Sequence, residues 1–258
     1  MEDKKRSQRE YCRIIDMNVD VTNLNSALLK VNELANQKSG SYVCVSNVHM
    51  CIETTDNQQF EKVVNSADLV IPDGKPLSWG QKLLGYTEAR QVRGQDIMNA
   101  LCNDSGKNSL NIGFYGGSSE ELLQVVADNM LANYPDINIT YMFSPPFRPL
   151  TEVENSTVIN DINNANVNVL FVGIGCPKQE LWMADHKESL NCVMLGVGAA
   201  FDFIAGSKKH APRWVQNIGM EWFFRLCTEP KRLWKRYLYT NPRFIWGFGK
   251  QLVKHRLG

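Results

Sequence analysis

The sequence predicts an α/β fold: a Rossmann-like, mostly parallel sheet with helices on both faces, plus a basic helical appendage at the C-terminus. Short β-branched runs alternate with helical stretches, which is typical of this class. Several runs, such as "VNVLFVG", are apolar throughout, as expected for strands buried on both faces. The alternation stops after about residue 207. We therefore expect an α/β core over 1–207 and a basic appendage over 208–258.

Periodicity and turn residues predict the elements in order. Residues 11–20 form a strand leading into a helix at 23–37, and 41–50 form a buried strand. A helix at 55–66, the strand "LVIPD", and helices at 75–85 and 95–103 follow. Strands and helices then alternate through "LNIGFYGG", "SSEELLQVVADNMLANYP", "INITYMFSPPF", 151–164, "VNVLFVGIGCP", "KQELWMADHKESL" and "CVMLGVGAAFDFIAG". Ser118 and Glu121 have the spacing of a capping box. Two helices, punctuated by Pro230 and Pro242, complete the chain.

Composition excludes a disordered chain, a collagen-like chain and a small disulfide-rich protein. With 258 residues, 43% of them hydrophobic and 21% charged, the chain can bury a large core. Its seven cysteines form no C-x-x-C pair, which favours reduced thiols in a cytoplasmic protein. The polar start "MEDKKRSQRE" has no apolar core of a signal peptide, and no run of about 18 apolar residues predicts a spanning helix.

Charge is distributed unevenly along the chain. Residues 208–258 hold twelve Lys or Arg and two acids, a net charge of +10, whereas the first 207 residues carry a net −9. Four of the six tryptophans also lie in this basic segment. In 231–238, an apolar aromatic stripe alternates with basic residues, as in helices that bind a membrane surface. A solvated basic helix face is the plainer alternative.

Ligands of parallel sheets bind beyond the carboxyl ends of the strands, so residues that follow strands are the site candidates. Glycine turns follow two of the strands, in "FYGGSSE" and "GIGCPKQE". The first leads into a helix N-terminus that could receive an anion, and neither turn completes the dinucleotide fingerprint G-x-G-x-x-G. A tight structural turn is the alternative for each. Histidines and cysteines lack metal-ligand spacing, and no Asp-x-Asp pair occurs, so we expect no metal and no cofactor. The candidates are Asn47, His49, Asp73, Gly116, Gly117, Gly175, Lys178 and Gln179.

Asp73, in "VIPDGKPLSWG", has two interpretations that the local sequence does not separate. It is either a turn or cap acid at the end of a strand, or a general base beside a polar ligand.

Several motifs, in order and over residues 12–245, resemble the WecG/TagA/CpsF glycosyltransferases (glycosyltransferase family 26). The motifs are "PDGKPLSWG", "RGQD", "GFYGGSSEE", "FVGIGCPKQELWM", "GVGAAFDFIAG", "KKHAPRW" and "GMEWFFRLCTEPKRLWKRY". The resemblance implies an inverting, metal-independent enzyme that moves a sugar from a UDP-sugar to a saccharide on polyprenyl diphosphate. Such enzymes build bacterial cell-surface polysaccharides.

The resemblance also implies residue roles. Asp73 corresponds to the proposed base, Asn47 to a residue near the acceptor and donor sugar, and Gln179 to a nucleotide-sugar contact. The appendage arginines that clamp the UDP diphosphate correspond to Arg225 and Arg232. A third such position falls on Lys235, with Arg236 as its rival.

Two positions depart from the family pattern. Val45 replaces a frequent Thr, with Ser46 adjacent, which leaves the donor sugar open. Gln91 stands where an arginine is usual, so Arg90 or Arg93 substitutes for it or the contact is lost.

We therefore predict a UDP-sugar-dependent hexosyltransferase whose donor is N-acetylmannosaminyl, N-acetylmannosaminuronyl or glucosyl. Its partners would be the UDP-sugar, a lipid-linked acceptor and the inner face of the cell membrane, reached through the C-terminal helices. No nucleic acid is expected, and a homo-oligomer stays open. The alternatives are a nucleotide-binding α/β protein of other chemistry and a non-enzymatic membrane-binding module.

Overall fold

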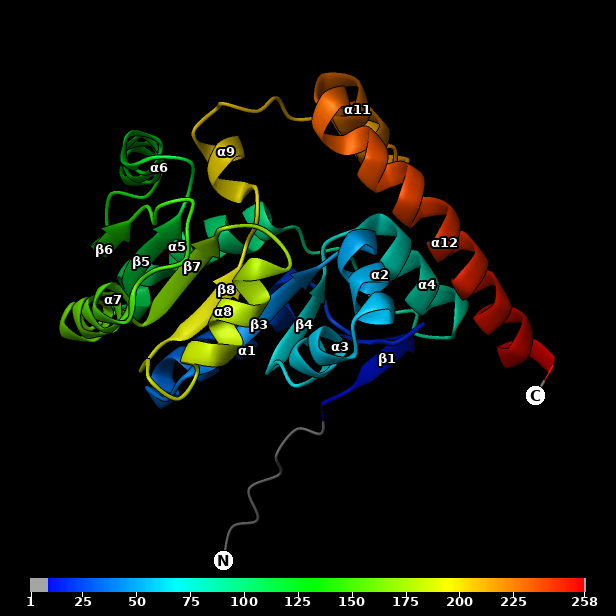
Figure 1. Cartoon of the computed structure of the whole chain (residues 1–258), viewed down its shortest axis with the longest axis horizontal. Helices are drawn as coiled ribbons and strands as arrows, with labels where there is room; N and C mark the ends of the chain where they lie inside the picture. The colour runs from blue at the N-terminus through cyan, green and yellow to red at the C-terminus, as the bar shows by residue number, and fades with distance from the viewer. Residues whose placement is uncertain (1–8, 258) are drawn as a thin grey trace, which may run out of the picture.

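Within residues 9–257, which the computed structural model describes, the central sheet has six parallel strands in the order β4-β3-β8-β7-β5-β6 (Figure 1). The strands are β3 Ser41–Ser46, β4 Leu69–Pro72, β5 Asn111–Gly116, β6 Asn138–Phe143, β7 Val169–Gly173 and β8 Val193–Gly196. The single strand predicted over 11–20 is wrong: β1 Tyr11–Ile14 and β2 Met17–Asp20 form a separate antiparallel hairpin with a turn at residues 15–16. The predicted parallel α/β fold is confirmed. Most of the N-terminal stretch used to argue against a signal peptide lies outside the described residues.

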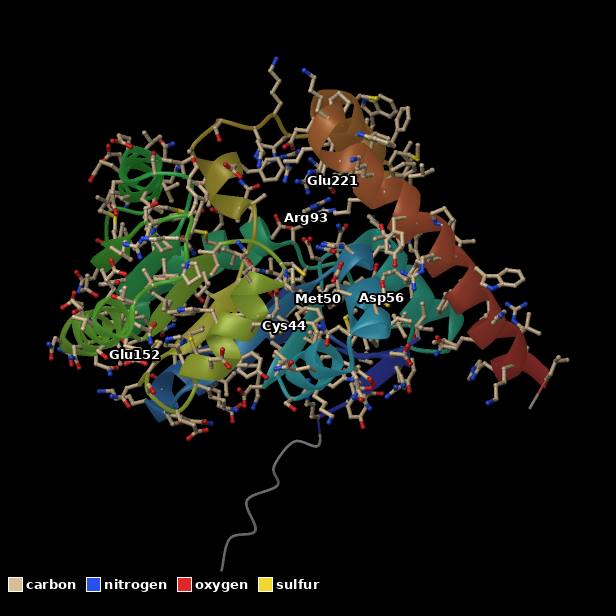
Figure 2. All side chains as sticks on the ribbon, viewed as in Figure 1. Cys44, Met50, Asp56, Arg93, Glu152 and Glu221 are labelled. Atoms are coloured by element: carbon tan, nitrogen blue, oxygen red, sulfur yellow. The ribbon has the colours of Figure 1, made fainter. Side chains whose placement is uncertain are left out.

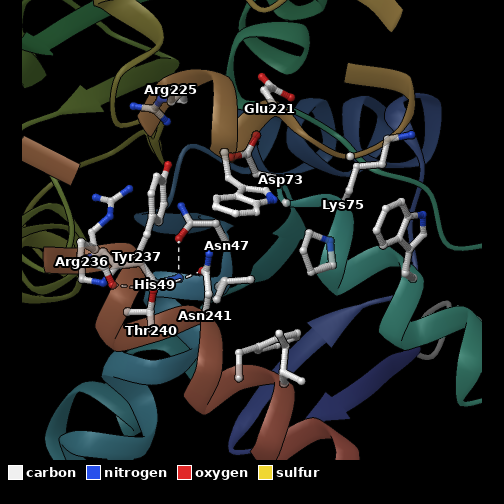
Figure 3. Close-up of a pocket in the computed structure, with 18 of the residues that line it drawn as sticks. Asn47, His49, Asp73, Lys75, Glu221, Arg225, Arg236, Tyr237, Thr240 and Asn241 are labelled. Atoms are coloured by element: carbon white, nitrogen blue, oxygen red, sulfur yellow. Dashed lines mark hydrogen bonds between the residues drawn. The ribbon is translucent and has the colours of Figure 1, made fainter. Parts of the chain in front are cut away.

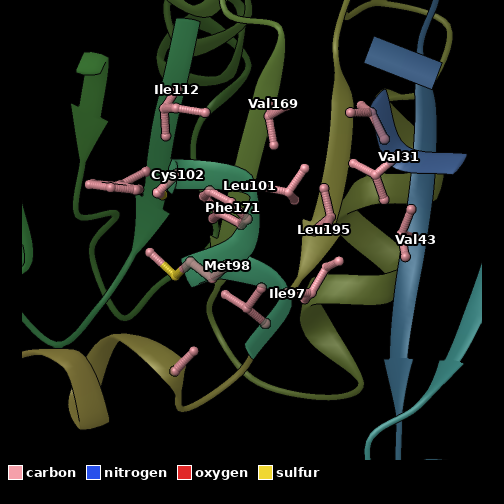
Figure 4. Packing of buried hydrophobic residues seen from close by; sticks show 14 of the residues in the cluster. Val31, Val43, Ile97, Met98, Leu101, Cys102, Ile112, Val169, Phe171 and Leu195 are labelled. Atoms are coloured by element: carbon pink, nitrogen blue, oxygen red, sulfur yellow. The ribbon is translucent and has the colours of Figure 1, made fainter. Parts of the chain in front are cut away.

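Successive side chains of each strand point to opposite faces, so the sheet separates two hydrophobic clusters. Val43 and Phe171 pack with the helices of one face, as Figure 4 shows, whereas Cys44 and Val172 pack with those of the other. The first face carries α1 Leu24–Gln37, α5 Gly94–Asn108, α6 Glu120–Asn133 and α9 Ala200–Ile204. The second carries α2 Val48–Asp56, α3 Gln58–Asn65, α7 Glu152–Asn164 and α8 Lys178–His186.

Several local predictions are wrong in their bounds or caps. The strand predicted over 41–50 ends at Ser46, because Asn47 caps α2 by accepting hydrogen bonds from the N–H groups of His49 and Met50. The predicted helix at 55–66 corresponds to α3, which is capped by Asn57, and its first two residues belong instead to the end of α2. Helix α5 runs on to Asn108, beyond the predicted end at residue 103, and α6 is capped by Ser119, not by Ser118.

The appendage differs from the two helices expected. Its first part is split into α10 Arg213–Asn217 and α11 Glu221–Thr228 by Gly219, whose positive φ of 74° ends a helical segment. The second part, α12 Pro230–Leu257, continues through Pro242. A proline inside a helix removes one backbone hydrogen bond, and here the carbonyl left over belongs to Leu238, an exposed residue that water can reach.

The second half of α12 is attached to the core. Phe244 and Phe248 are buried beside α4 Lys75–Leu83 and the hairpin. The Gln251 side chain accepts a hydrogen bond from the backbone N–H of Ile15 (2.8 Å) and donates one to the carbonyl of Arg13 (2.6 Å). No helix among residues 9–257 combines the length and the hydropathy needed to cross a bilayer.

Candidate active site

Asp73 follows β4 directly and is held by three segments of the core. Its backbone N–H donates to the carbonyl of Ser46 (2.8 Å), and its carboxylate accepts from the N–H of Gly94 at the start of α5 (3.2 Å). Gly74, not Asp73, is the N-cap residue of α4, and that cap has no side-chain hydrogen bond. Asp73 is therefore not the cap of the helix that follows it, and its half-buried side chain lines two cavities, one of which Figure 3 shows.

The surroundings of Asp73 favour its protonated form more than water does. Burial raises the pKa of Asp73 to about 7, and the negative charge of Glu221 acts in the same direction. The Gly94 N–H, Arg225 and Arg93 act in the opposite direction with smaller effect. A carboxylate whose pKa lies near neutrality can accept a proton from a hydroxyl more readily than an ordinary aspartate.

Two cavities meet at Asp73. A polar cavity of about 540 Å³ lies at the carboxyl ends of β3, β7 and β8, and a largely apolar cavity of about 480 Å³ lies between α4, α11 and α12. Both are bounded by the same group of polar side chains, all of which Figure 3 labels. These shared residues are Asn47, His49, Asp73, Glu221, Arg225 and Arg236.

Arginines that lack full charge compensation line the polar cavity. Among residues 9–257, no carboxylate lies within 4 Å of Arg236, and the Nε atoms of Arg236 and Arg225 are buried without a hydrogen-bond partner. Burial lowers the pKa of Arg236, and the like charges of Arg225 and Arg232 lower it further. A bound anion would relieve this arrangement, because guanidinium groups bind phosphate oxygens with charge-assisted hydrogen bonds. The cations of this cavity are Arg93, Lys208, Arg213, Arg225, Arg232 and Arg236.

Gln179 borders the polar cavity at the start of α8. Its Nε2 donates to Glu180 Oε1 (2.6 Å), which leaves its Oε1 buried and without a hydrogen-bond partner. Gly196 makes room for this side chain, since a Cβ at that position would lie 2.9 Å from Gln179 Nε2. The free Oε1 can accept a hydrogen bond from a polar ligand in the cavity.

Asn47 and His49 shape the junction of the cavities. The Asn47 side-chain oxygen is engaged in capping α2. Burial, together with the charge of Arg236, lowers the pKa of His49 to about 4, so His49 is neutral at physiological pH. No group of three or more His, Cys, Asp or Glu side chains in the described part of the chain is arranged to hold a metal ion.

A family model described as "Glycosyl transferase WecG/TagA/CpsF family" matches residues 12–258. The chain belongs to this glycosyltransferase family. Family membership favours an enzyme of this chemistry over another nucleotide-binding α/β protein or a non-enzymatic module.

Curated relatives of this WecG/TagA/CpsF glycosyltransferase carry the name N-acetylglucosaminyldiphosphoundecaprenol N-acetyl-beta-D-mannosaminyltransferase. The Bacillus spizizenii protein is 26% identical over 210 residues, which cover 81% of this chain and 79% of the relative. The Bacillus subtilis protein is 27% identical, with 81% and 78% covered. The Staphylococcus aureus protein is 24% identical over 250 residues, with 96% and 95% covered.

Many of the residues singled out in the sequence of this family member line the two cavities. The structure also separates the rival candidates. Arg236 lines both cavities, whereas Lys235 points to solvent over the ring of Trp234, at 5.6 Å from its centroid. Arg93 lines the polar cavity, whereas Arg90 bonds backbone carbonyls of its own turn. The cavity residues among the candidates are Asn47, His49, Asp73, Arg93, Gly175, Gln179, Arg225, Arg232 and Arg236.

The remaining candidates do not line either cavity. The hydroxyl of Ser46 is fully buried and donates to the carbonyl of Ile71 (2.8 Å). Gly116 and Gly117 form a turn at the end of β5, where a Cβ on Gly116 would lie 2.6 Å from the backbone of Gly173. This close approach of two backbones explains why a glycine stands at position 116. Lys178 begins α8, and like Arg90 and Lys235 it lies outside the lining of both cavities.

Glu221 and Gln91 are site residues that the sequence analysis did not assign. Glu221, on α11, lies next to Arg93, which precedes α5; 3.4 Å separates Glu221 Oε2 from Arg93 Nε (Figure 2). Gln91 Nε2 donates to the backbone carbonyl of Asp73 (2.6 Å) and so supports the loop that presents the carboxylate. Glu221 lies within the quoted motif "GMEWFF", but only the fold reveals that this motif reaches Asp73.

Proposed function

We propose that this glycosyltransferase moves a sugar, with inversion and without a metal ion, from a UDP-sugar to a saccharide on polyprenyl diphosphate, in bacterial cell-surface polysaccharide synthesis. The names of the relatives support an N-acetylmannosaminyl group as the donor sugar and N-acetylglucosaminyl diphosphoundecaprenol as the acceptor. N-acetylmannosaminuronyl and glucosyl donors are the competing candidates. The position of Asp73 between a cation-lined cavity and an apolar cavity carries the proposal.

Asp73 would act as the general base. Its carboxylate takes the proton of the acceptor hydroxyl while the hydroxyl oxygen attacks the anomeric carbon of the donor. The bond between that carbon and the diphosphate oxygen breaks on the opposite side, which inverts the anomeric centre. UDP departs with the electron pair of the broken bond, and the proton stays on Asp73.

The arginines would stabilise the departing diphosphate. Negative charge develops on UDP as the glycosidic bond breaks, and Arg225 and Arg236 line the cavity beside Asp73. Arg232 borders the same cavity, although its Nε also donates to Glu229 (2.7 Å). This charge is supplied by side chains, so the proposal needs no metal bridge to the diphosphate. Gln179 Oε1, which lacks a partner, would accept a hydrogen bond from the nucleotide sugar.

The appendage would bring the enzyme to its lipid-linked acceptor. Exposed aromatic and aliphatic side chains on α11 and α12 alternate with basic residues, a composition that suits the surface of an anionic membrane. We place the enzyme on the cytoplasmic face of the cell membrane as a peripheral protein, with residues 208–258 as the docking unit. The side chains concerned include Phe223, Trp234, Leu238, Ile245 and Trp246.

A panel of UDP-sugars tests the donor and the reaction together. Each is incubated with N-acetylglucosaminyl diphosphate on a short prenyl chain, with and without EDTA, and the product mass is measured. We expect one N-acetylhexosamine to be added from UDP-N-acetylmannosamine, equally with EDTA, and a new glycosidic bond of inverted configuration by NMR. No product from any UDP-sugar would refute the proposal. Loss of product with EDTA would refute metal independence.

A further inference from the structure

The cavity between α4, α11 and α12 is built mainly from apolar side chains. Trp79 on α4 closes against the turn at Gly219, where a Cβ would lie only 2.3 Å from the Trp79 ring. Trp222 packs edge-on against Tyr237, with ring centroids 5.9 Å apart. Aliphatic and further aromatic groups complete the walls, namely Pro76, Pro242, Phe244 and Ile245. A polar sugar alone would leave much of this surface without a matching partner.

The cavity opens toward an apolar stripe on the outside of α12. Ile245 belongs to the cavity wall and is nevertheless 71% exposed. Trp234 and Leu238 are also exposed, and spacings of four and seven residues place them on the same helix face as Ile245. Trp234, Leu238 and Ile245 thus form an exposed apolar stripe on which a chain leaving the cavity at Ile245 can lie.

Charged groups lie at the other side of the same cavity. Asp73 and the guanidinium groups of Arg225 and Arg236 line it where it meets the polar cavity, and Lys75 lines it at the start of α4 (Figure 3). The cavity is thus amphipathic, with cations near the carboxylate and apolar walls farther out. Its charge complements a ligand that joins an anionic head to an apolar chain.

We propose that this cavity binds the isoprene units nearest the diphosphate of the lipid-linked acceptor. The diphosphate lies at Lys75, on the opposite side of Asp73 from Arg225 and Arg236 (Figure 3), and the rest of the chain leaves over Ile245. The inference rests on the proposed function and adds to it the part of the protein that recognises the lipid. It assigns acceptor recognition to the apolar cavity, and it leaves the polar cavity to the nucleotide sugar.

Calorimetry with farnesyl diphosphate and inorganic diphosphate tests this assignment without requiring sugar transfer. Both are titrated into the full chain with UDP present to occupy the polar cavity and without vesicles or detergent. We expect farnesyl diphosphate to bind at least about 10-fold more tightly, because burial of only two methylene groups accounts for such a factor. Equal affinities for the two probes would overturn the proposal.

Two charge-introducing variants of α12 locate the chain. Ile245→Glu should make farnesyl diphosphate bind no more tightly than inorganic diphosphate. Val253→Glu should keep the difference in affinity, because Val253 is 58% exposed on the same helix but lies outside the cavity. An unchanged advantage in Ile245→Glu, or an equal loss in both variants, would overturn the proposal. If the wild type shows the chain-dependent binding yet transfers no sugar, the proposed reaction fails and the apolar site stands.

Discussion

The two cavities that share Asp73 are built in different ways. The polar cavity is formed largely by loops that follow β3, β7 and β8, with appendage arginines closing it. The apolar cavity is formed by α4, α11 and α12, whose contacts join segments far apart in the chain. The polar side of the candidate site therefore depends on strand ends of the core, and the apolar side depends on how the appendage lies against the core.

Asp73 belongs to both cavities, and its loss should have the largest effect. Asp73→Asn should lower turnover by about 10²–10⁴-fold, as expected for loss of a general base, while UDP affinity stays nearly unchanged. Steady-state transfer and UDP calorimetry measure the two quantities. Asp128→Asn, an exposed position on α6, is the control and should behave as wild type. Full activity of Asp73→Asn would remove the base from the mechanism.

The effect of Asp73→Asn on the free energy of unfolding should depend on pH. The pKa of Asp73 is raised from 3.8 to about 7, so the folded state binds more protons than the unfolded state between these values. Its contribution to stability is complete below pH 3.8 and is lost as pH rises through 7. Asp73→Asn should therefore be at least as stable as wild type at pH 8, by chemical denaturation, which separates lost catalysis from lost folding.

The attachment of α12 to the core can be broken selectively. Phe248→Ala removes a buried ring that packs against Phe244 and Gly80, and it should lower the free energy of unfolding by about 3 kcal/mol. Phe223→Ala, at a half-exposed position of α11, should change it by much less. Urea denaturation measures both. Equal effects would mean that α12 is not part of the folded core. Deletion of 208–258 should likewise destabilise the core, because it removes Phe244 and Phe248.

The polar cavity can be weakened without altering the apolar walls. Arg236→Gln should lower kcat by about 10–100-fold, because one cation beside the departing diphosphate is lost. Lys235→Gln is the neighbouring control and should have little effect, since Lys235 lies outside both cavities. Transfer kinetics with saturating donor measure kcat. A larger loss in Lys235→Gln than in Arg236→Gln would reverse the assignment of the third basic position.

The smallest predicted effect concerns the pH profile. The rate should rise with pH to a plateau, with a midpoint near 7, because Asp73 must be deprotonated to act as a base. Glu221→Gln removes a like charge and should move the midpoint to lower pH, by less than about one unit. Glu188→Gln, on the surface, should not move it. A midpoint that stays fixed in Glu221→Gln would show that Glu221 does not act on Asp73.

Local patterns in the sequence were sufficient to predict the strands of the parallel sheet and the loops that line the polar cavity. Apolar runs predict buried strands, and parallel strands place the residues that follow them at one edge, so Asp73 and Gln179 could be recognised as candidates. The pattern failed at 47–57, where β-branched and aliphatic residues continued past the strand into a helix. Only the side-chain cap of Asn47, which depends on the backbone turn, ends the strand there.

The sequence by itself determined the family, the α/β core, the strand-end aspartate and the basic aromatic character of the last fifty residues. The tertiary structure alone decided which of the neighbouring cations line the two cavities. Lys235 and Arg236 differ by about 100° around α12, and the packing of Phe244 and Phe248 sets the rotation of that helix. The position of α11 beside α5 brings Glu221 near Asp73, where its charge adds to the effect of burial in raising the pKa of Asp73. These properties arise from contacts between distant segments, and no local pattern encodes them.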